Sequence, residues 1–474
     1  MAALDGNPIR SILNDYDFPV IDPTKPPFRV QKLTCALLSS KQRGYVLNDI
    51  GTGKTRCVLW TYDYMHRFTR QANRMLVVAP LSTLLSVWAK EIRSEFYWLK
   101  VAILHGTKAQ RLKALASNAD IYVINHHGVH TLLQELKARK DINVIVVDEL
   151  SVYRNGRSKN LTLAFKELAF GHDWVWGMTG SPCPRAVTDV WGQASCITPG
   201  TIPKYFSWFR GQLMTKVSQF KWEPRPGAEE MAIKCLQPSV RFKMNDVKEL
   251  PERVFRYYDA PMTPKQAAIY KEMSSKAVAM IQSHQIDGLN AGAVMNKLLQ
   301  IAIGYVYTRE GGVIELDNTP RLQLIVDLID SCAYNVILFA PFKSAINGFH
   351  KLLETNGITH CVVSGDTPIR TRADLFKGFE EQGRYKVLLT HPGCMAHGLT
   401  LTSATMNIWG GPITSLDLFF QANGRIFRLG QKFKTLIAMI GGSAREKKLY
   451  TLLGNNEKLQ NRFLELIETE TEND

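Results

Sequence analysis

The first group of residues that could do chemistry is the run Asp49-Ile50-Gly51-Thr52-Gly53-Lys54-Thr55. It lies between a short apolar run, Tyr45–Asn48, which predicts a strand, and Cys57–Tyr64, which predicts a helix. This context is typical of a phosphate cradle, because glycines let backbone N–H groups approach the phosphates and the helix N-terminus adds its positive end. The residues expected to contact a nucleoside triphosphate are Gly51, Thr52, Gly53, Lys54 and Thr55.

Two side chains of this run have separate expected roles. Lys54 would contact the β- and γ-phosphates, and the Thr55 hydroxyl would be a ligand of Mg²⁺. Asn48 stands where the usual pattern has its first glycine. The alternative is a Gly-Lys-Thr turn that arose by chance, and the flanking strand and helix argue against it. The run therefore predicts a site for ATP and Mg²⁺.

The second group is acidic. Val144–Val147 predicts a buried strand, and Asp148 and Glu149 follow it directly. Two carboxylates at the end of a buried strand are costly unless a metal or a proton transfer uses them. Asp148 would hold Mg²⁺ through water, and Glu149 would polarise the attacking water; the alternative is a pair of acids that cap a loop. Further along, Thr179-Gly180-Ser181-Pro182 follows another predicted strand and by itself indicates only a turn.

The third group is the late run Gln421-Ala422-Asn423-Gly424-Arg425-Ile426-Phe427-Arg428-Leu429-Gly430-Gln431. If this run is helical, Gln421, Arg425 and Arg428 share one face. Two arginines aimed at one point suit a phosphate whose charge grows in the transition state. They lie far from Lys54 in the sequence, in a second lobe, so catalysis would require the two lobes to close. The alternative is a basic, solvated helix face.

The elements that must position these groups are short apolar runs separated by stretches with helical spacing, such as Ser82–Phe96 and Ala109–Ala116. Such an alternation predicts an α/β fold in which parallel sheets are sandwiched by helices. The first set of predicted strands is Tyr45–Asn48, Met75–Ala79, Val101–Leu104, Ile121–Ile124, Val144–Val147 and Trp174–Met178. The second set is Val336–Ala340, Cys361–Val363, Val387–Leu389, Met406–Trp409 and Leu436–Ile440.

This pattern divides the chain into two lobes and three other segments. The lobes are residues 28–200, which hold the ATP-binding run, and residues 318–455, which hold the arginines. Residues 201–317 predict a mostly helical insertion between the lobes or on them. Residues 1–27 form an N-terminal extension, and residues 456–474 are an acidic tail that we expect to be frayed.

The charge balance indicates a polyanionic partner. The 474 residues include 58 Lys and Arg against 43 Asp and Glu, a net charge of +15. Nucleic acid is the first candidate for so basic a protein, and a basic surface kept for solubility is the alternative. The 8 cysteines form no CxxC pair, which predicts reduced thiols and no zinc site. No apolar run is long enough for a membrane span and Met1–Arg10 has no secretory pattern, so we expect a cytoplasmic protein without a membrane partner.

Taken in order along the chain, these groups resemble helicase superfamily two, Swi/Snf branch, over residues 28–453. The His-Gly-Leu form of residues 397–399 resembles the compact bacteriophage-type members. The resemblance implies two RecA-like lobes, with Gln31 reading adenine and Gly398 sensing the nucleotide in the second lobe. The residues that it implies for nucleic-acid contact are Pro80, Thr179, Ser181, Ser364 and Thr390.

The predicted function is that of an ATP-dependent DNA translocase or helicase in phage DNA replication, recombination or repair, in the host cytoplasm. It would bind double- or single-stranded DNA mainly through phosphates, and hence with little dependence on sequence. Departures from the family at Leu150-Ser151, Thr400 and Ser443–Glu446 bear on how ATP and DNA are coupled, and strand separation is left open. Three alternatives remain: an RNA-directed helicase of the same superfamily, a P-loop enzyme that phosphorylates a small molecule, and a nucleic-acid-binding protein without motor activity.

Two weaker features have competing interpretations. His126, His127 and His130 lie close together, and His126 and His130 could share a metal if helical, but no Glu or Cys supports them. The stretch Lys204–Trp222 interleaves basic and aromatic residues without an acid. Such a mixture can grip a phosphate backbone while stacking bases. The alternative is that these aromatic residues pack the insertion onto a lobe.

Overall fold

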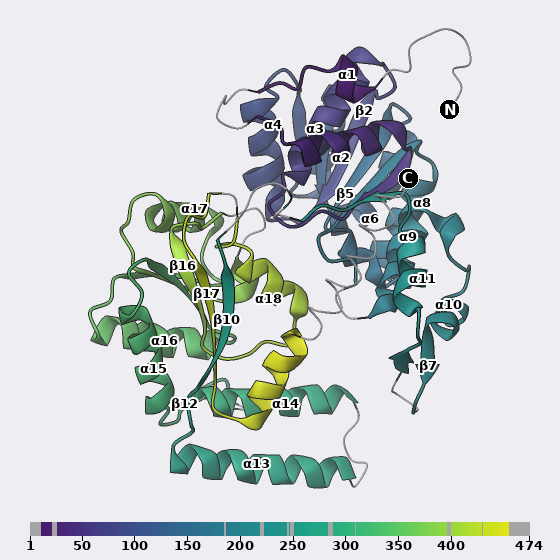
Figure 1. The fold of residues 1–474 in the computed structure, drawn as a ribbon. Helices are drawn as coiled ribbons and strands as arrows, with labels where there is room; N and C mark the ends of the chain where they lie inside the picture. The colour runs from purple at the N-terminus through teal and green to yellow at the C-terminus, as the bar shows by residue number, and fades with distance from the viewer. Residues whose placement is uncertain are drawn as a thin grey trace. The chain divides into compact units, whose positions relative to one another are not determined.

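The computed structural model (Figure 1) describes residues 11–20, 26–183, 186–218, 222–243, 246, 251–282, 288–308, 310–395, 400–428 and 430–454. The chain divides into two units, residues 1–249 with 458–474 and residues 250–457. Each unit holds one large parallel sheet, as the sequence predicts. In the part of the chain that is described, no helix is long and apolar enough to cross a membrane, and no group of three or more His, Cys, Asp or Glu residues is arranged to hold a metal ion.

The sheet of the first unit has seven strands in the order β3-β4-β2-β5-β6-β1-β9, and every neighbouring pair is parallel. The strands are β1 (Arg43–Val46), β2 (Arg74–Ala79), β3 (Val101–Leu104), β4 (Ile121–Asn125), β5 (Ile142–Asp148), β6 (Trp174–Met178) and β9 (Ser239–Val240). The six predicted apolar runs are confirmed as β1 to β6, since strands covered on both faces are apolar throughout. The edge strand β9 has no counterpart among the predicted strands, because two residues carry no pattern.

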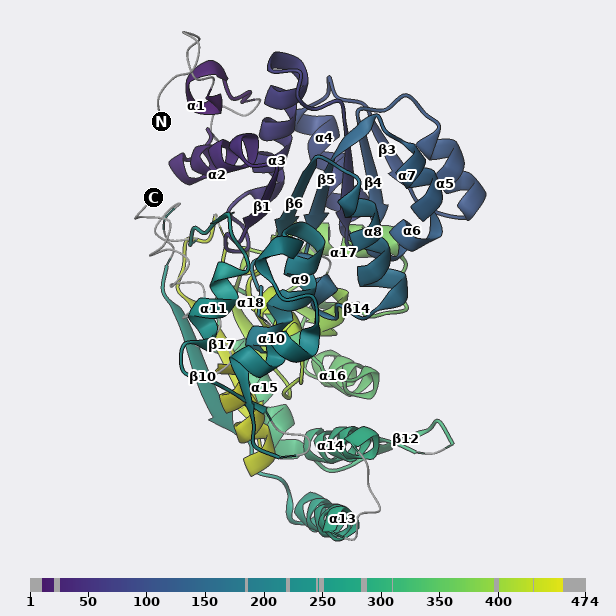
Figure 2. The same ribbon diagram turned by 90° about the vertical axis from the view of Figure 1, so that its right-hand side faces the viewer.

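Helices cover both faces of this sheet (Figure 2). On one face, α2 and α3 pack with the π-helix Leu84–Ala89 and α4, and Trp60 and Trp88 are buried there. On the other face, α5 to α9 pack around Phe165. The predicted helices at Cys57–Tyr64, Ser82–Phe96 and Ala109–Ala116 are confirmed. The α-helices of this unit are α1 (Ile12–Asp15), α2 (Arg29–Ser40), α3 (Lys54–Asp63), α4 (Lys90–Glu95), α5 (Lys108–Leu115), α6 (His126–Thr131), α7 (Leu133–Ala138), α8 (Ala164–Phe170), α9 (Val190–Ile197), α10 (Phe206–Leu213) and α11 (Ala228–Lys234).

The sheet of the second unit has six strands in the order β10-β17-β16-β13-β15-β14, again all parallel. The strands are β10 (Arg253–Asp259), β13 (Asn335–Phe339), β14 (His360–Val363), β15 (Val387–Thr390), β16 (Ala404–Trp409) and β17 (Thr435–Gly441). Five of them confirm the predicted runs. The edge strand β10 is absent from the prediction, because its residues are only partly buried and form no apolar run. The helices are α13 (Pro264–Gln282), α14 (Gly288–Ile303), α15 (Thr319–Asp330), α16 (Lys343–Thr355), α17 (Ile369–Glu380) and α18 (Leu416–Asn423).

The segment 201–317, predicted as a mostly helical insertion, is divided between the two units. Residues 201–249 belong to the first unit and contribute α10, α11, β9 and an antiparallel hairpin, β7 (Met214–Lys216) with β8 (Trp222–Pro224). Residues 250–317 belong to the second unit and contribute β10, α13, α14 and a hairpin, β11 (Tyr305–Tyr307) with β12 (Val313–Glu315). The insertion is therefore helical in large part but also supplies an edge strand to each sheet.

Candidate nucleotide-binding site

The predicted phosphate loop connects the carboxyl end of β1 to the first turn of α3. Gly51 has φ 90° and Gly53 has φ 82°, a backbone region that favours glycine. Gly53 is the N-cap of α3, and Lys54 is the first residue of that helix. The loop therefore presents backbone N–H groups and the positive end of a helix, which together favour an anion.

The Lys54 ammonium lies inside this loop. It donates hydrogen bonds to the backbone carbonyl of Asn48 at 2.9 Å and to that of Asp49 at 3.0 Å. Burial lowers the pKa of Lys54, whereas the nearby charges of Glu149, Asp148 and Asp49 raise it. The lysine and the two predicted catalytic carboxylates are thus close enough to act on one another, and phosphate oxygens can replace the two loop carbonyls as acceptors.

Gln31, predicted to read adenine, lies beside the same loop on α2. Its amide nitrogen donates to the Thr52 carbonyl at 3.0 Å, and its amide oxygen accepts from the Phe28 N–H at 2.9 Å. A Cβ atom at Gly53 would overlap the Gln31 amide nitrogen, so glycine at that position lets the loop and the glutamine meet. Gln31 therefore holds the loop in place, and its adenine contact stays a prediction.

Asn48, which stands in place of the usual first glycine, ties the loop to two neighbouring elements. Its side chain donates to the Thr34 hydroxyl at 3.0 Å and accepts from the Phe242 N–H at 2.9 Å. The Phe242 carbonyl in turn accepts from the Asp49 N–H at 3.0 Å. A glycine could make neither side-chain bond, so the departure from the usual pattern has a structural role.

Arg241 is a residue at the site that the sequence prediction did not identify. It follows β9, its side chain is 2% exposed, and its Nη2 pairs with the Asp49 carboxylate at 2.5 Å. Its Nη1 donates to the Phe242 carbonyl at 2.8 Å. Because 192 positions separate Arg241 from Asp49, no local pattern connects them. The pair joins the loop to the segment that leaves the first sheet.

The acidic pair lies at the predicted place. Asp148 is the last residue of β5 and is in register with Met178 of β6, which is in register with Val46 of β1. One Asp148 oxygen accepts from the Trp88 indole N–H at 3.0 Å. Glu149 has φ 57° and ψ 55°, a conformation that non-glycine residues rarely adopt. Such strained residues cluster at functional sites, which supports the predicted role of Glu149.

Residues Thr55 and Asp148 remain the candidate ligands of Mg²⁺. Both offer oxygen, the donor that Mg²⁺ prefers, and this ion usually keeps several waters and needs only one or two protein ligands. The residues present therefore fit the predicted ion.

The residues of the first unit that are predicted to contact nucleic acid differ in their exposure to solvent. Thr179 is buried, and its hydroxyl accepts from the Ser181 N–H at 3.0 Å. Its contact with nucleic acid stays a prediction. Pro80 and Ser181 are partly exposed. A Cβ at Gly180 would contact Ile50, which places this turn against the phosphate loop.

The arginine run departs from the predicted helix. Helix α18 ends at Asn423, so Gln421 is helical while Arg425 and Arg428 follow the helix end. Arg425 is 1% exposed and Arg428 is 9% exposed, so neither lies on a solvated helix face. The Arg428 Nε donates to the Gly424 carbonyl at 2.9 Å. The run is therefore a helix end followed by a folded loop.

Two amide side chains hold this loop. The Asn423 oxygen accepts from Asn407 and from the Trp409 indole, each at 3.0 Å, which ties the helix end to β16. Gln431 donates to the backbone carbonyls of Ala404 at 3.0 Å and Ile426 at 2.9 Å. Both residues belong to the run that the sequence singled out, but their roles depend on contacts with a distant strand.

The remaining predicted site residues of the second unit also differ in their exposure to solvent. Ser364 is partly exposed, and its backbone N–H donates to the Thr367 hydroxyl at 3.0 Å. Thr390 is fully buried, and its hydroxyl donates to the Val363 carbonyl at 2.8 Å. The contact of Thr390 with nucleic acid stays a prediction. Gly398 lies outside the described residues.

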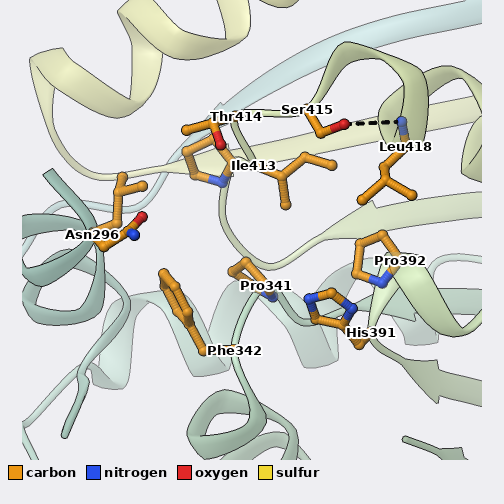
Figure 3. A pocket seen from close by; sticks show the side chains of 11 residues that line it. Asn296, Pro341, Phe342, His391, Pro392, Ile413, Thr414, Ser415 and Leu418 are labelled. Atoms are coloured by element: carbon orange, nitrogen blue, oxygen red, sulfur yellow. Dashed lines mark hydrogen bonds between the residues drawn. The ribbon is translucent and has the colours of Figure 1, made fainter. Parts of the chain in front are cut away.

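A pocket of about 180 Å³ opens in the second unit at the carboxyl ends of its strands (Figure 3). Phe342 follows β13, and His391 and Pro392 follow β15. Burial lowers the pKa of His391, which favours its neutral form. The pocket lies on the edge of the sheet where ligands of open α/β folds bind. Its lining residues are Asn296, Leu299, Pro341, Phe342, His391, Pro392, Pro412, Ile413, Thr414, Ser415 and Leu418.

The histidine cluster has a structural explanation. His126 begins α6, is buried, and its Nδ1 lies 3.1 Å from the Tyr153 hydroxyl. In the described part of the chain no metal-binding group includes it. A hydrogen bond to Tyr153 accounts for its position.

A phosphate loop at the end of β1, an acidic pair at the end of β5 and a second parallel α/β unit with buried arginines define a RecA-like motor ATPase. The chain belongs to the SNF2-related family: the SNF2-related domain matches residues 30–303, and the helicase conserved C-terminal domain matches residues 320–430. It is thus an SNF2-family core of the ATP-dependent helicase and translocase type, with two RecA-like lobes. Membership implies an ATP hydrolase that uses ATP with a divalent metal.

Three relatives indicate the range of the family. The chain is 24% identical over 394 residues to putative protein p41 of Acyrthosiphon pisum secondary endosymbiont phage 1, covering 79% of this chain and 82% of that protein. It is 21% identical to the ATP-dependent helicase MG018 of Mycoplasma genitalium, covering 90% of this chain but only 41% of that protein. The solved SWI2/SNF2 ATPase core of Sulfolobus solfataricus in complex with dsDNA is 20% identical, with 92% of each chain covered and a TM-score of 0.45.

Proposed function

We propose that this protein is a DNA-dependent ATPase that uses ATP hydrolysis to move along DNA. The observation that carries the proposal is the Lys54 ammonium, which lies inside the phosphate loop and whose pKa responds to Asp148 and Glu149. A lysine and two carboxylates at one strand edge can bind a triphosphate and activate water. A passive binding protein has no need of this set.

In the proposed reaction, Lys54 exchanges its two loop carbonyls for oxygens of the β- and γ-phosphates. A magnesium ion held by Thr55 and, through water, by Asp148 would neutralise phosphate charge. Glu149 accepts a hydrogen bond from the attacking water and orients it toward the γ-phosphorus. Arg425 and Arg428 then stabilise the charge that develops on the transferred group when the second unit approaches the nucleotide.

The proposed partner is DNA, bound mainly through its phosphates. The net charge of +15 favours a polyanion. Pro80, Ser181 and Ser364 are the predicted contact residues that the structure leaves at least partly exposed. Phosphate contacts carry little sequence information, so we expect binding to be non-specific and to weaken steeply with salt. The chain is similar to a phage protein, and we propose a role in phage DNA replication, recombination or repair in the cytoplasm of the host.

The experiment is a comparison of ATPase rates with duplex DNA, single-stranded DNA, forked DNA and RNA, together with a strand-displacement assay on the fork. We expect DNA to stimulate hydrolysis and Lys54→Ala to abolish it. Lys113→Ala is the matched control, because Lys113 is an exposed lysine of α5 in the same unit. Stimulation by RNA alone would indicate an RNA-directed helicase. Transfer of phosphate to a small acceptor would indicate a kinase, and a rate unchanged by Lys54→Ala would indicate a protein without motor activity.

A further inference from the structure

Two large aromatic side chains are exposed side by side on the first unit. Tyr205 directly precedes α10 and is 52% exposed, and Trp208 in its first turn is 66% exposed. Their rings are T-shaped with centroids 5.3 Å apart. The opposite face of the same helix is in the core, where Phe209 and Leu213 are buried. The helix is thus anchored by one face and presents aromatic rings on the other.

One cation lies beside the Tyr205 ring, and Arg210 lies beside the neighbouring rings of Phe206 and Trp222. The Lys204 ammonium lies 5.7 Å from the Tyr205 ring centroid. The Arg210 guanidinium lies 5.7 Å from the Phe206 ring and 4.1 Å from the Trp222 ring. No Asp or Glu occurs between residues 190 and 222. We call Lys204, Tyr205, Trp208 and Arg210, with Arg157, the aromatic-basic patch.

Arg157 brings a distant loop into this patch. Its guanidinium lies 5.5 Å from the ring of Phe206, the first residue of α10. Phe206 also packs edge-on against Trp191 of α9, with centroids 5.5 Å apart. The patch is therefore built from two segments far apart in the sequence, and the packing of Phe206 on Trp191 fixes the start of α10 against α9.

We propose that the aromatic-basic patch binds unpaired bases of a nucleic-acid strand. This inference rests on the proposed function and adds to it the form of DNA that the first unit holds. Exposed aromatic rings can stack on any base, whereas the bases of a duplex already cover one another's faces. The flanking cations neutralise the phosphates of the same strand. Exposed aromatic rings with Lys204, Arg157 and Arg210 nearby fit a polyanion with free π-faces better than they fit an acidic peptide, which offers charge but no faces to stack.

The patch is connected to the nucleotide site by packed elements of the first unit. Glu149 is followed directly by the short 3-10 helix Leu150–Arg154, and the same loop continues to Arg157. A Cβ at Gly192 of α9 would overlap the Tyr153 carbonyl, so α9 lies directly on that short helix. A strand bound at the patch therefore contacts the loop that begins at the proposed water-activating residue. We expect its occupancy to affect ATP hydrolysis.

The test compares Trp208→Ala with Phe170→Ala, a control at an exposed aromatic residue (86%) of α8 in the same unit. Fluorescence anisotropy would measure binding of an oligothymidine strand and of a blunt duplex of equal length at one salt concentration. We expect Trp208→Ala to weaken single-strand binding about tenfold or more, the usual effect of losing one stacked base, and duplex binding less than twofold. Phe170→Ala should change neither, and Trp208→Phe should restore most of the single-strand affinity.

Several results would overturn the inference. One is single-strand binding by Trp208→Ala that equals that of Phe170→Ala. Another is an equal loss on single strand and duplex, which would make the patch a general phosphate contact. A third is a wild-type protein that sediments as a dimer while Trp208→Ala sediments as a monomer. That result would make the aromatic-basic patch a protein interface. Binding is measured without ATP, so its result does not depend on ATP hydrolysis. Failure of the proposed function would instead appear as an ATPase rate that no nucleic acid changes.

Discussion

The ion pair between Arg241 and Asp49 leads to a prediction about the free energy of unfolding: removing Asp49 should lower it more than removing Arg241. Arg241 Nη2 and Asp49 Oδ1 are 2.5 Å apart, and the side chains are 2% and 36% exposed. Asp49→Ala would leave the guanidinium buried without this carboxylate. Breaking a buried pair in this way costs roughly 3–5 kcal/mol. Because water reaches Asp49, we expect the lower end of that range, about 3 kcal/mol.

Arg241→Met should cost less. The Asp49 carboxylate stays in contact with water, so the main loss is a hydrogen bond to a charged group, which methionine offsets in part by filling the buried position. We expect a loss of about 1 kcal/mol. In the double variant no buried cation remains, so its stability should be close to that of Arg241→Met and about 2 kcal/mol above that of Asp49→Ala.

Urea denaturation of the wild type and these three variants measures the free energies. Circular dichroism and tryptophan fluorescence should be followed together, because a chain of two units need not unfold in one step. The KM for ATP should rise most in Asp49→Ala, because the lost ion pair with Arg241 helps to fix the loop whose Asn48 and Asp49 backbone carbonyls hold Lys54. A loss for Arg241→Met as large as that for Asp49→Ala, or a double variant equal to the sum of the single losses, would refute the reasoning.

Three further predictions concern single residues. Gly53→Ala should cost about 1–2 kcal/mol and weaken nucleotide binding, measured by titration, because φ is 82° and the new Cβ would overlap the Gln31 amide. Glu446→Ala should destabilise the second unit by roughly 3–5 kcal/mol in calorimetry, because Glu446 is buried and pairs with the buried Arg321 at 2.9 Å; an unchanged transition would contradict this. Burial raises the pKa of Glu91 to about 7, so the contribution of Glu91 to stability should be complete below its ordinary pKa of 4.5 and should be lost as the pH rises through about 7. Glu91→Gln should remove that fall in urea midpoints measured across this range, and an identical pH dependence in both proteins would count against it.

Prediction from sequence succeeded where one residue pattern decides the structure. The apolar runs became strands β1 to β6 and β13 to β17, because a strand covered on both faces must be apolar along its length. The run Asp49–Thr55 became the predicted loop, because glycine permits its backbone conformation. The prediction failed at β9 and β10, whose residues are too few or too exposed to form an apolar run.

The arginine run shows why a local pattern can mislead. Its spacing matches a helix face, but α18 ends at Asn423. The Asn423 amide oxygen is engaged by Asn407 and Trp409 of β16, and the loop beyond is held by Gln431. Asn407 and Trp409 belong to β16, and Gln431 bonds to Ala404 of the same strand, so helical spacing could not reveal where the helix stops.

The sequence alone determined the class of chemistry of this protein: a glycine-rich loop with Lys54, and Asp148 and Glu149 at the end of an apolar strand, predict hydrolysis of a nucleoside triphosphate. Only the tertiary structure decided what supports the loop, because Arg241 is 192 positions from Asp49 and reaches it through the parallel pairing of β9 with β1. The same holds for the aromatic-basic patch. Its aromatic residues are visible in the sequence, but folding decided that Phe209 is buried while Tyr205 and Trp208 remain exposed.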